Sequence, residues 1–389
     1  MRNSGRTTGR LSTVALLLAS TAIAILLAEF GLRIALNPGD FLQATLVEDP
    51  ALGHRIEPFS TGHDALGFRN RKVPPQADIV AIGDSMTYGV SAPREGSWPH
   101  QLSRSTGESV YNMALGGYGP LQYLHLAKTS APSLKPRLFI VGFYFGNDLL
   151  DAFNLSHARP HWHGWRLSNA AKATTKPETE GDAEPQKRFG ALRKWLAHHS
   201  LLYSVLKATV LQRFATDEQD AMAKEVGADT RMLWSDPVDP QVRTIFTPRH
   251  HLRVMDMDLA DVGEGFQISK RAFAELKVAA QQQNAGLLVA LIPTKGRAYC
   301  RYLAKSKSNL PATFARHCDA EEKARVAISG VLRSQGIEYV DVLPALEARV
   351  ERHEQIYPPG FDGHPQAAGY AAIAEVIATT VRERFPRRY

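Results

Sequence analysis

Apolar residues gather in five short runs that alternate with amphipathic segments along most of the chain. The runs are residues 79–82, 110–113, 138–145, 287–292 and 337–342. Apolar residues at helical spacing occupy the segments between and after them, at residues 98–105, 121–129, 268–283, 320–334 and 366–384. Continuous apolar strands separated by such helices are typical of a parallel sheet that helices cover on both faces. The pattern therefore predicts an α/β fold.

The N-terminus predicts a membrane anchor. Arg2, Arg6 and Arg10 precede residues 11–28, which form an uncharged stretch of eighteen residues. This length is near the lower limit for crossing a bilayer, and positive charge before it favours a cytoplasmic N-terminus. We expect a cytoplasmic segment at 1–10, a transmembrane signal anchor at 11–36 in the inner membrane, and a body in the periplasm. A cleaved signal peptide is the alternative, because Ala22-Ile23-Ala24 resembles a cleavage site, but the apolar run continues beyond it.

The remaining chain divides by composition. Residues 37–76 contain Pro, Gly and polar residues and predict an extended tether, followed by the two parts of a catalytic domain at 77–151 and 263–389. Residues 152–262 interrupt the alternation of strands and helices and are too long for an ordinary loop, so we expect a helical cap insertion. Its stretch 174–187 is expected to be disordered. A single helix at about 189–214 carries an apolar stripe, which predicts packing on the enzyme. Alternatively this helix rests on a membrane through basic residues, namely Arg188, Arg193, Lys194, Lys207 and Arg213.

Charge and cysteine content add little to this organisation. The net charge is +7, but the positive residues are scattered and form no recognition helix, so no nucleic-acid partner is expected. Cys300 and Cys318 are the two cysteines, and in an exported protein they could form a disulfide or remain two thiols.

Candidate catalytic groups follow the strands. Ser85 follows the first strand, Gly117 the second and Asn147 the third, while Asp362 and His364 lie near the C-terminus. In open α/β sheets the carboxyl ends of the strands are where ligands bind. Each of these residues alone also suits a turn or a helix cap.

Together these residues resemble the four motif blocks of the SGNH (GDSL-type) hydrolases, a family of serine esterases. The blocks here are Gly83-Asp84-Ser85, Asn112 with Gly117 five residues later, Gly146-Asn147-Asp148, and Asp362-Gly363-His364-Pro365. The resemblance covers about residues 77–151 and 286–385 and implies a flavodoxin-like doubly wound sheet. Much of the family has Asp-x-x-His, whereas Asp362 stands two before His364, as in the related alginate-type O-acetylation proteins. Residues i and i+2 of an extended segment share a face, so the contact stays possible.

The roles follow from serine chemistry. We expect Ser85 as nucleophile, His364 as general base and Asp362 as the group that orients and stabilises the imidazole. The oxyanion hole would consist of the Ser85 and Gly117 N–H groups and the Asn147 amide, with Gly116 as the alternative glycine. Thr87 replaces the second glycine of an α/β-hydrolase elbow, which argues against that class.

Further residues are weaker candidates. Asp341 is a second choice for the acid, and Lys295 and Tyr299 either contact substrate or pack in the core. The histidines at 157, 161 and 163 lack a matching set of ligands, so we expect no metal and no cofactor.

The leading hypothesis is an extracytoplasmic esterase that hydrolyses O-acyl, chiefly O-acetyl, esters, with an acylated envelope polysaccharide as the expected substrate. A polysaccharide O-acetyltransferase using the same residues is the first alternative. A non-catalytic envelope scaffold or glycan-binding protein is the second. The oligomeric state is left open.

Overall fold

The computed structural model describes residues 4–167, 190–208, 212–306 and 310–387. A five-stranded parallel sheet lies at its centre. In chain order its strands are β3 (Ile79–Gly83), β4 (Val110–Ala114), β5 (Leu138–Tyr144), β8 (Gly286–Ile292) and β9 (Glu338–Asp341). The spatial order β4-β3-β5-β8-β9 is the flavodoxin-like arrangement, with the chain reversing direction of winding beside β3. The predicted fold class is confirmed.

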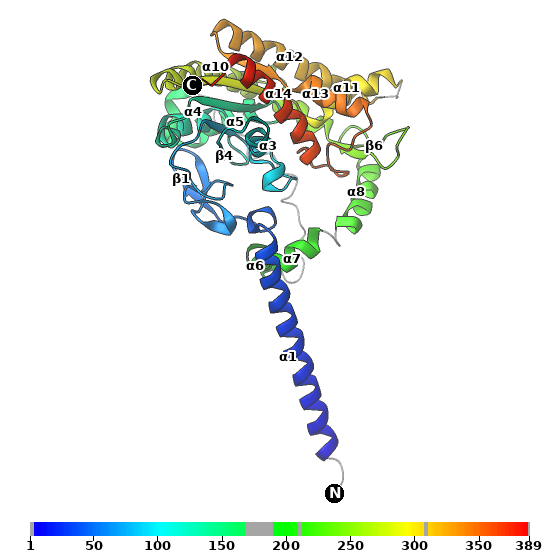
Figure 1. Ribbon diagram of the computed structural model, residues 1–389. Coiled ribbons are helices and arrows are strands. Elements are labelled where there is room, and N and C mark those ends of the chain that lie inside the picture. Colours follow the sequence, from blue (N-terminus) through cyan, green and yellow to red (C-terminus); the bar gives the residue numbers. More distant parts are fainter. Residues whose placement is uncertain (1–3, 168–189, 209–211, 307–309, 388–389) are drawn as a thin grey trace.

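Helices cover both faces of this sheet (Figure 1). One face is covered mainly by α4 (Pro120–Thr129), α5 (Asp148–Ala158), α10 (Ala260–Gln282) and α12 (Ala312–Ser334). The other carries α3 (Trp98–Thr106), α11 (Lys295–Lys305), α13 (Leu343–Glu351) and α14 (Ala367–Arg384). All residues of β3 and β5 are buried, which explains why those strands are continuously apolar in sequence.

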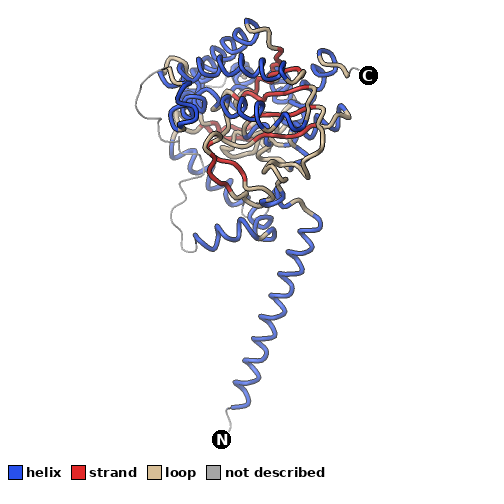
Figure 2. Tube along the Cα trace, turned by 90° about the vertical axis from the view of Figure 1, so that its left-hand side faces the viewer, coloured by secondary structure: helices blue, strands red, loops and turns tan. Residues whose placement is uncertain are grey.

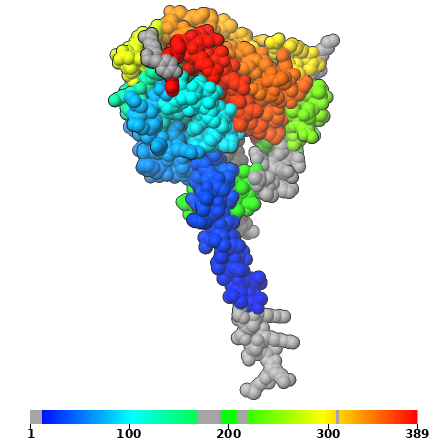
Figure 3. Space-filling model, viewed as in Figure 1, coloured from blue at the N-terminus to red at the C-terminus, as the bar shows by residue number. Residues whose placement is uncertain are grey.

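The N-terminal helix α1 (Ser4–Ala35) extends away from this body as a stalk (Figure 3). Within the described residues, Thr13–Ala35 is the one helical stretch long and apolar enough to cross a membrane, and none of it is buried in the body. The expected tether that follows contains η1 (Pro38–Asp40), η2 (Ser60–Gly62) and an antiparallel hairpin of β1 (Leu46–Asp49) and β2 (Gly53–Ile56).

The expected cap region contains several short elements. In chain order these are the end of α5, η5 (Pro160–Trp165), α6 (Gly190–His199), α7 (Leu201–Leu206), α8 (Gln212–Val226), β6 (Met232–Ser235), β7 (Arg243–Phe246) and α9 (Pro248–Met255). The stretch 174–187, which we expect to be disordered, lies outside the described residues.

The expected single helix over about 189–214 is wrong, because the chain breaks at Ser200. The Ser200 side chain accepts a hydrogen bond from Tyr203 N and so starts α7 as a new helix. Glu29 of α1 accepts hydrogen bonds from Leu201 N and Leu202 N, which stabilises this second start. Apolar periodicity did not reveal this break, because the carboxylate that accepts the first N–H groups of α7 belongs to Glu29, 172 positions before Leu201.

Cys300 and Cys318 form a disulfide between α11 and α12, with 6.0 Å between their Cα atoms. Because the bond closes a loop with a sequence separation of 18, it should stabilise the fold by roughly 3 kcal/mol through the unfolded state. We expect the double variant C300S/C318S, and the reduced wild-type protein, to lose about that free energy of unfolding in a denaturant titration. Equal stability with and without reductant would contradict this prediction.

Candidate active site

Ser85 stands at the carboxyl end of β3, at the first position of the short helix α2 (Ser85–Tyr88). The preceding Asp84 caps this helix by accepting a hydrogen bond from Met86 N at 2.9 Å. A Cβ atom at Gly83 or Gly142 would overlap the Thr87 side chain, so these glycines let α2 pack closely on the strands. The turn therefore presents the Ser85 hydroxyl above the sheet edge rather than inside the sheet.

His364 and Asp362 reach this hydroxyl from the loop between α13 and α14. His364 Nε2 lies 2.8 Å from Ser85 Oγ. Asp362 Oδ1 lies 2.6 Å from His364 Nδ1 and accepts a second hydrogen bond from His364 N at 3.0 Å. The two-residue spacing thus suffices for the carboxylate to contact the imidazole. The structure brings together three side chains that the sequence separates by up to 279 positions.

The surroundings keep Asp362 ionised. Burial alone would raise its pKa, but the hydrogen bonds and charge of His364, together with the Ser91 hydroxyl, lower the pKa to about 2. Asp362 is therefore a carboxylate at neutral pH, able to stabilise a positive charge on the imidazole.

Two residues support this loop. Ser91 Oγ donates a hydrogen bond to Asp362 Oδ2, and Ser91 adopts a left-handed backbone with φ of 64°. Lys295, which is 1% exposed, donates from Nζ to the carbonyl oxygens of Gly360 and Asp362 at 3.0 Å each. The sequence predicted that Lys295 lies near the site, but it did not predict these hydrogen bonds or any role for Ser91.

Tyr299 is buried among Trp234, Phe246 and Tyr357, so it belongs to the core.

Lys295 should matter for rate because it fixes the loop that carries the imidazole. We expect Lys295→Met to lower kcat for a simple ester by about 10²-fold with little change in KM, since small displacements of catalytic groups have effects of that size. Lys295→Arg should recover part of the rate. A Lys295→Met enzyme that is folded by circular dichroism and has full kcat would contradict this role.

Besides Ser85 itself, the predicted oxyanion residues follow the strands β4 and β5, which flank β3 in the sheet. Asn147 precedes α5, and its buried Oδ1 has no hydrogen-bond partner among the described residues. A Cβ atom at Gly116 would lie 3.6 Å from Ser85 Cβ, whereas one at Gly117 would lie 3.4 Å from His54 Cε1. Gly116 thus borders Ser85, whereas Gly117, which has a φ of 77°, borders His54. His54, from β2 of the tether, was not predicted; its Nε2 lies 2.9 Å from Gly116 O.

Three carboxyl groups are packed behind Ser85. Burial raises the pKa of Asp84 to about 6. Burial and the charge of Asp84 raise the pKa of Asp151 to about 8 and that of Asp148 well above its usual value. Asp148 also accepts hydrogen bonds from Tyr123 OH at 2.9 Å and Tyr144 N at 3.0 Å. These contacts fix the turn that carries Asn147.

These raised pKa values predict a pH-dependent stability. The folded protein keeps protons on these carboxyls up to pH of about 6 and about 8, whereas the unfolded chain releases them near its usual pKa of about 4. The stability contributed by these protons is therefore greatest below the unfolded pKa, falls as the pH rises from there to the folded pKa, and is level above the folded pKa. We expect Asp151→Asn to remove the decline between about pH 6 and 8, where Asp84 no longer contributes, making the variant roughly 1–3 kcal/mol more stable than wild type at pH 9. The exposed Asp319→Asn serves as control, and parallel stability curves for wild type and Asp151→Asn would contradict the prediction.

The weaker candidates lie elsewhere. Asp341 pairs with Arg325 and accepts a hydrogen bond from Leu343 N at 3.0 Å, so it does not orient His364. His157 pairs with Glu264 at 2.9 Å. Over the described ranges, no group of three or more potential metal ligands occurs.

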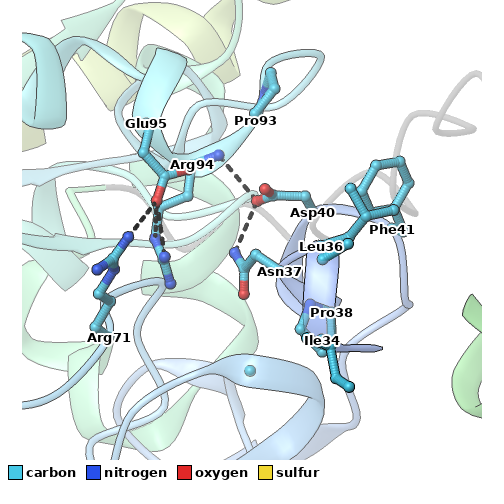
Figure 4. Close-up of a pocket in the computed structure, with 12 residues that line it drawn as sticks. Ile34, Leu36, Asn37, Pro38, Asp40, Phe41, Arg71, Pro93, Arg94 and Glu95 are labelled. Carbon is cyan, nitrogen blue, oxygen red and sulfur yellow. Dashed lines mark hydrogen bonds and ion pairs between the residues drawn. The ribbon is translucent and has the colours of Figure 1, made fainter. Parts of the chain in front are cut away.

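A cavity of about 630 Å³ lies away from Ser85, at the junction of α1 and the body (Figure 4). Its wall includes Ile34, Asp40, Arg71 and the turn η3 (Arg94–Gly96). Arg94 and Arg71 both pair with Glu95, at 2.8 Å and 3.5 Å. The cavity is not part of the serine site.

The parallel sheet has the flavodoxin-like order that the resemblance to the SGNH (GDSL-type) hydrolases implies. No protein-family model and no curated protein matches the chain.

Similar solved structures include three esterases and hydrolases of low sequence identity. A GDSL-like lipase from Bacteroides thetaiotaomicron is 9% identical, with 78% of this chain and 87% of that chain covered and a TM-score of 0.35. A hydrolase from the metagenome of Lake Arreo, Spain, is 12% identical, with 81% and 99% covered and a TM-score of 0.36. A carbohydrate esterase family 2 enzyme with a carbohydrate-binding domain, from Corynascus thermopiles (Myceliophthora fergusii), is 11% identical, with 80% and 68% covered and a TM-score of 0.37. Likenesses of this size carry no weight for substrate or mechanism, which depend on the site itself.

Proposed function

We propose that this protein is a membrane-anchored serine esterase that removes O-acyl groups, chiefly O-acetyl groups, from a polysaccharide of the cell envelope. The observation that carries the proposal is the contact of His364 Nε2 with Ser85 Oγ at 2.8 Å, continued by Asp362 at 2.6 Å. A serine hydroxyl becomes a nucleophile when an adjacent base takes its proton, and this chain of contacts supplies such a base.

Acylation would proceed as follows. Ser85 Oγ attacks the ester carbonyl carbon while its proton passes to His364 Nε2, and the negative charge of Asp362 stabilises the resulting imidazolium. The carbonyl oxygen, now negative, accepts hydrogen bonds from the Ser85 N–H, the Gly117 N–H and the Asn147 amide. Collapse of the tetrahedral intermediate breaks the bond to the alcohol, which takes the proton from His364. Ser85 then carries the acyl group.

Deacylation repeats these steps with water. His364 removes a proton from a water molecule as its oxygen attacks the acyl carbon, and the proton returns to Ser85 Oγ when the acid departs. Since the chain's own groups supply every proton transfer, this reaction needs no cofactor.

The proposed location rests on α1. The candidate span Thr13–Ala35 has an uncharged part that ends at residue 28 and suits the hydrocarbon layer, and Arg2, Arg6 and Arg10 before it favour a cytoplasmic N-terminus. The body would then lie in the periplasm, where envelope polysaccharides are accessible.

The test uses the purified full-length protein in detergent with p-nitrophenyl acetate and with an acetylated oligosaccharide. Hydrolysis predicts a burst of nitrophenol equal to the enzyme concentration, followed by steady release of acetate from both substrates. Ser85→Ala should give neither. If the acetyl group appears on an added oligosaccharide and acetate is released slowly, the protein is an acetyltransferase rather than a hydrolase. If neither activity is found, the proposal is contradicted.

A further inference from the structure

Two short helices, α6 and α7, carry large apolar side chains on the surface. Leu192 and Trp195 of α6 are 53% and 56% exposed, and Leu206 of α7 is 50% exposed. Leu192 and Trp195 are three residues apart and therefore lie on one face of their helix. Arg193 and Lys194 are exposed beside them. Large apolar side chains bordered by charge are typical of a surface that binds a partner.

The same two helices are attached to the end of α1. Glu29 accepts hydrogen bonds from Ser200 Oγ at 3.0 Å, from Leu201 N at 3.0 Å and from Leu202 N at 2.9 Å. Arg33 bonds Glu29 at 2.8 Å and donates to His199 O at 2.6 Å. Glu29 and Arg33 in the last turns of this apolar helix thus pair with each other, and both are hydrogen-bonded to the α6–α7 junction.

This attachment determines the depth of α7. The uncharged stretch 11–28 comprises eighteen residues and spans about 27 Å as a helix, close to the ~30 Å thickness of the hydrocarbon layer. Glu29 directly follows that stretch and would lie where the hydrocarbon meets the headgroups. Because α7 begins on the Glu29 carboxylate, α7 would lie at the same level.

A second attachment comes from the tether. Gln43 N donates to Ala197 O at 3.0 Å, and His198 Nδ1 donates to Gln43 O at 2.8 Å. Figure 1 places α6 and α7 beside the end of α1 nearest the body, and Figure 2 shows helices beneath the body on the side from which α1 emerges. The exposed apolar residues are therefore held on the side of the body that would face a membrane.

We propose that α6 and α7 form a membrane-surface pair that lies in the outer interface of the bilayer crossed by α1. Leu192, Trp195 and Leu206 contact the upper acyl chains. Arg193, Lys194 and Lys207 are exposed and would attract anionic phospholipid headgroups. The partner is a phospholipid surface rather than another protein, because the pair is continuous with the candidate membrane span and carries the charge that such lipids attract. This inference depends on the proposed anchoring by α1.

The pair would restrict how the body moves above the membrane. A single helical stalk permits the body to tilt and rotate, whereas a second contact with the interface, attached through Glu29 and Gln43, fixes one face toward the lipid. The serine site would then be held at a constant height above the membrane.

The test places spin labels on the full-length protein in vesicles of phosphatidylglycerol and phosphatidylcholine. Labels react with introduced free cysteines, since Cys300 and Cys318 are joined in a disulfide. Three variants are compared, L192C on α6, L18C in α1 and V278C on α10. All three positions are exposed in the structure, at 53%, 67% and 49%. Collisions with oxygen, which concentrates in lipid, and with a water-soluble nickel complex report the surroundings of each label.

The proposal predicts that the label at 192 resembles that at 18, with high oxygen and low nickel accessibility, and that the label at 278 shows the opposite. Replacement of phosphatidylglycerol by phosphatidylcholine should reduce the oxygen accessibility at 192 but not at 18. If 18 is in lipid and 192 resembles 278, the surface pair is wrong while the anchor remains. If 18 is in water, the anchor fails and the surface pair fails with it. Each labelled variant should hydrolyse p-nitrophenyl acetate at the wild-type rate, which shows that it is folded.

Discussion

Replacement of Ser85 by alanine is expected to lower kcat/KM for p-nitrophenyl acetate by roughly 10⁵-fold. The variant keeps the imidazole and the proposed oxyanion donors but has no group that can form the proposed acyl-enzyme. Its fold should be unchanged, because among the described residues the Ser85 hydroxyl hydrogen-bonds only His364 and, at 3.4 Å, Asp84. Steady-state kinetics measure the loss, and thermal unfolding checks the fold.

Ser105→Ala is the matched control, since Ser105 lies on α3 and its hydroxyl bonds Leu102 O at 3.0 Å, remote from the site. Its rate should equal that of wild type. A Ser85→Ala enzyme that retains more than about one hundredth of the wild-type rate would exclude Ser85 as the nucleophile.

Replacement of Asp362 by alanine is expected to lower kcat by roughly 10⁴-fold with little change in KM. The variant loses both the hydrogen bond that orients His364 Nδ1 and the negative charge that stabilises the imidazolium. Asp362→Asn should lose less. Its amide oxygen can still accept from His364 while its nitrogen faces Ser91, so only the charge is removed.

Asp341→Ala provides the control for this pair of variants. Asp341 was the alternative acid in the sequence, but it pairs with Arg325 in the structure, so its removal should leave kcat unchanged. A larger loss for Asp341→Ala than for Asp362→Ala would reverse the assignment.

The central sheet could be predicted from sequence because its strands are buried on both faces. β3, β5 and β8 lie in the middle of the sheet, and their apolar runs match the observed strands to within a residue at each end. The edge strand β9 carries Glu338 and Asp341, and its limits differ by one residue at both ends rather than at one, because Ile337 and Val342 fall outside it. The order of the strands came from the family resemblance, since periodicity does not encode it.

The candidate site was predictable where local chemistry reveals it. Ser85, Asn147 and the Asp362–His364 pair stand in short blocks that can be identified along the chain. Ser91 could not be found in this way, because its role depends on a hydrogen bond to a residue 271 positions away. His54 was missed for the same reason: it reaches the Gly116 carbonyl from a hairpin in the segment expected to be only a tether.

The break between α6 and α7 illustrates the same limit. The apolar stripe continues through Ser200, so its periodicity predicts one helix. What ends the first helix and starts the second is the carboxylate of Glu29, which belongs to α1. Tertiary contacts of this kind override local propensity. They also leave Leu192, Trp195 and Leu206 of the apolar stripe exposed beside α1 instead of packed in the core.

Covalent labelling tests the central claim most directly. The full-length protein is treated with a fluorophosphonate, digested and analysed by mass spectrometry, with the Ser85→Ala variant beside it. The contact between Ser85 and His364 predicts one phosphonylated peptide, modified at Ser85 in the wild type and absent from the variant. An unreactive wild type, or an adduct that persists when Ser85 is alanine, would contradict the account.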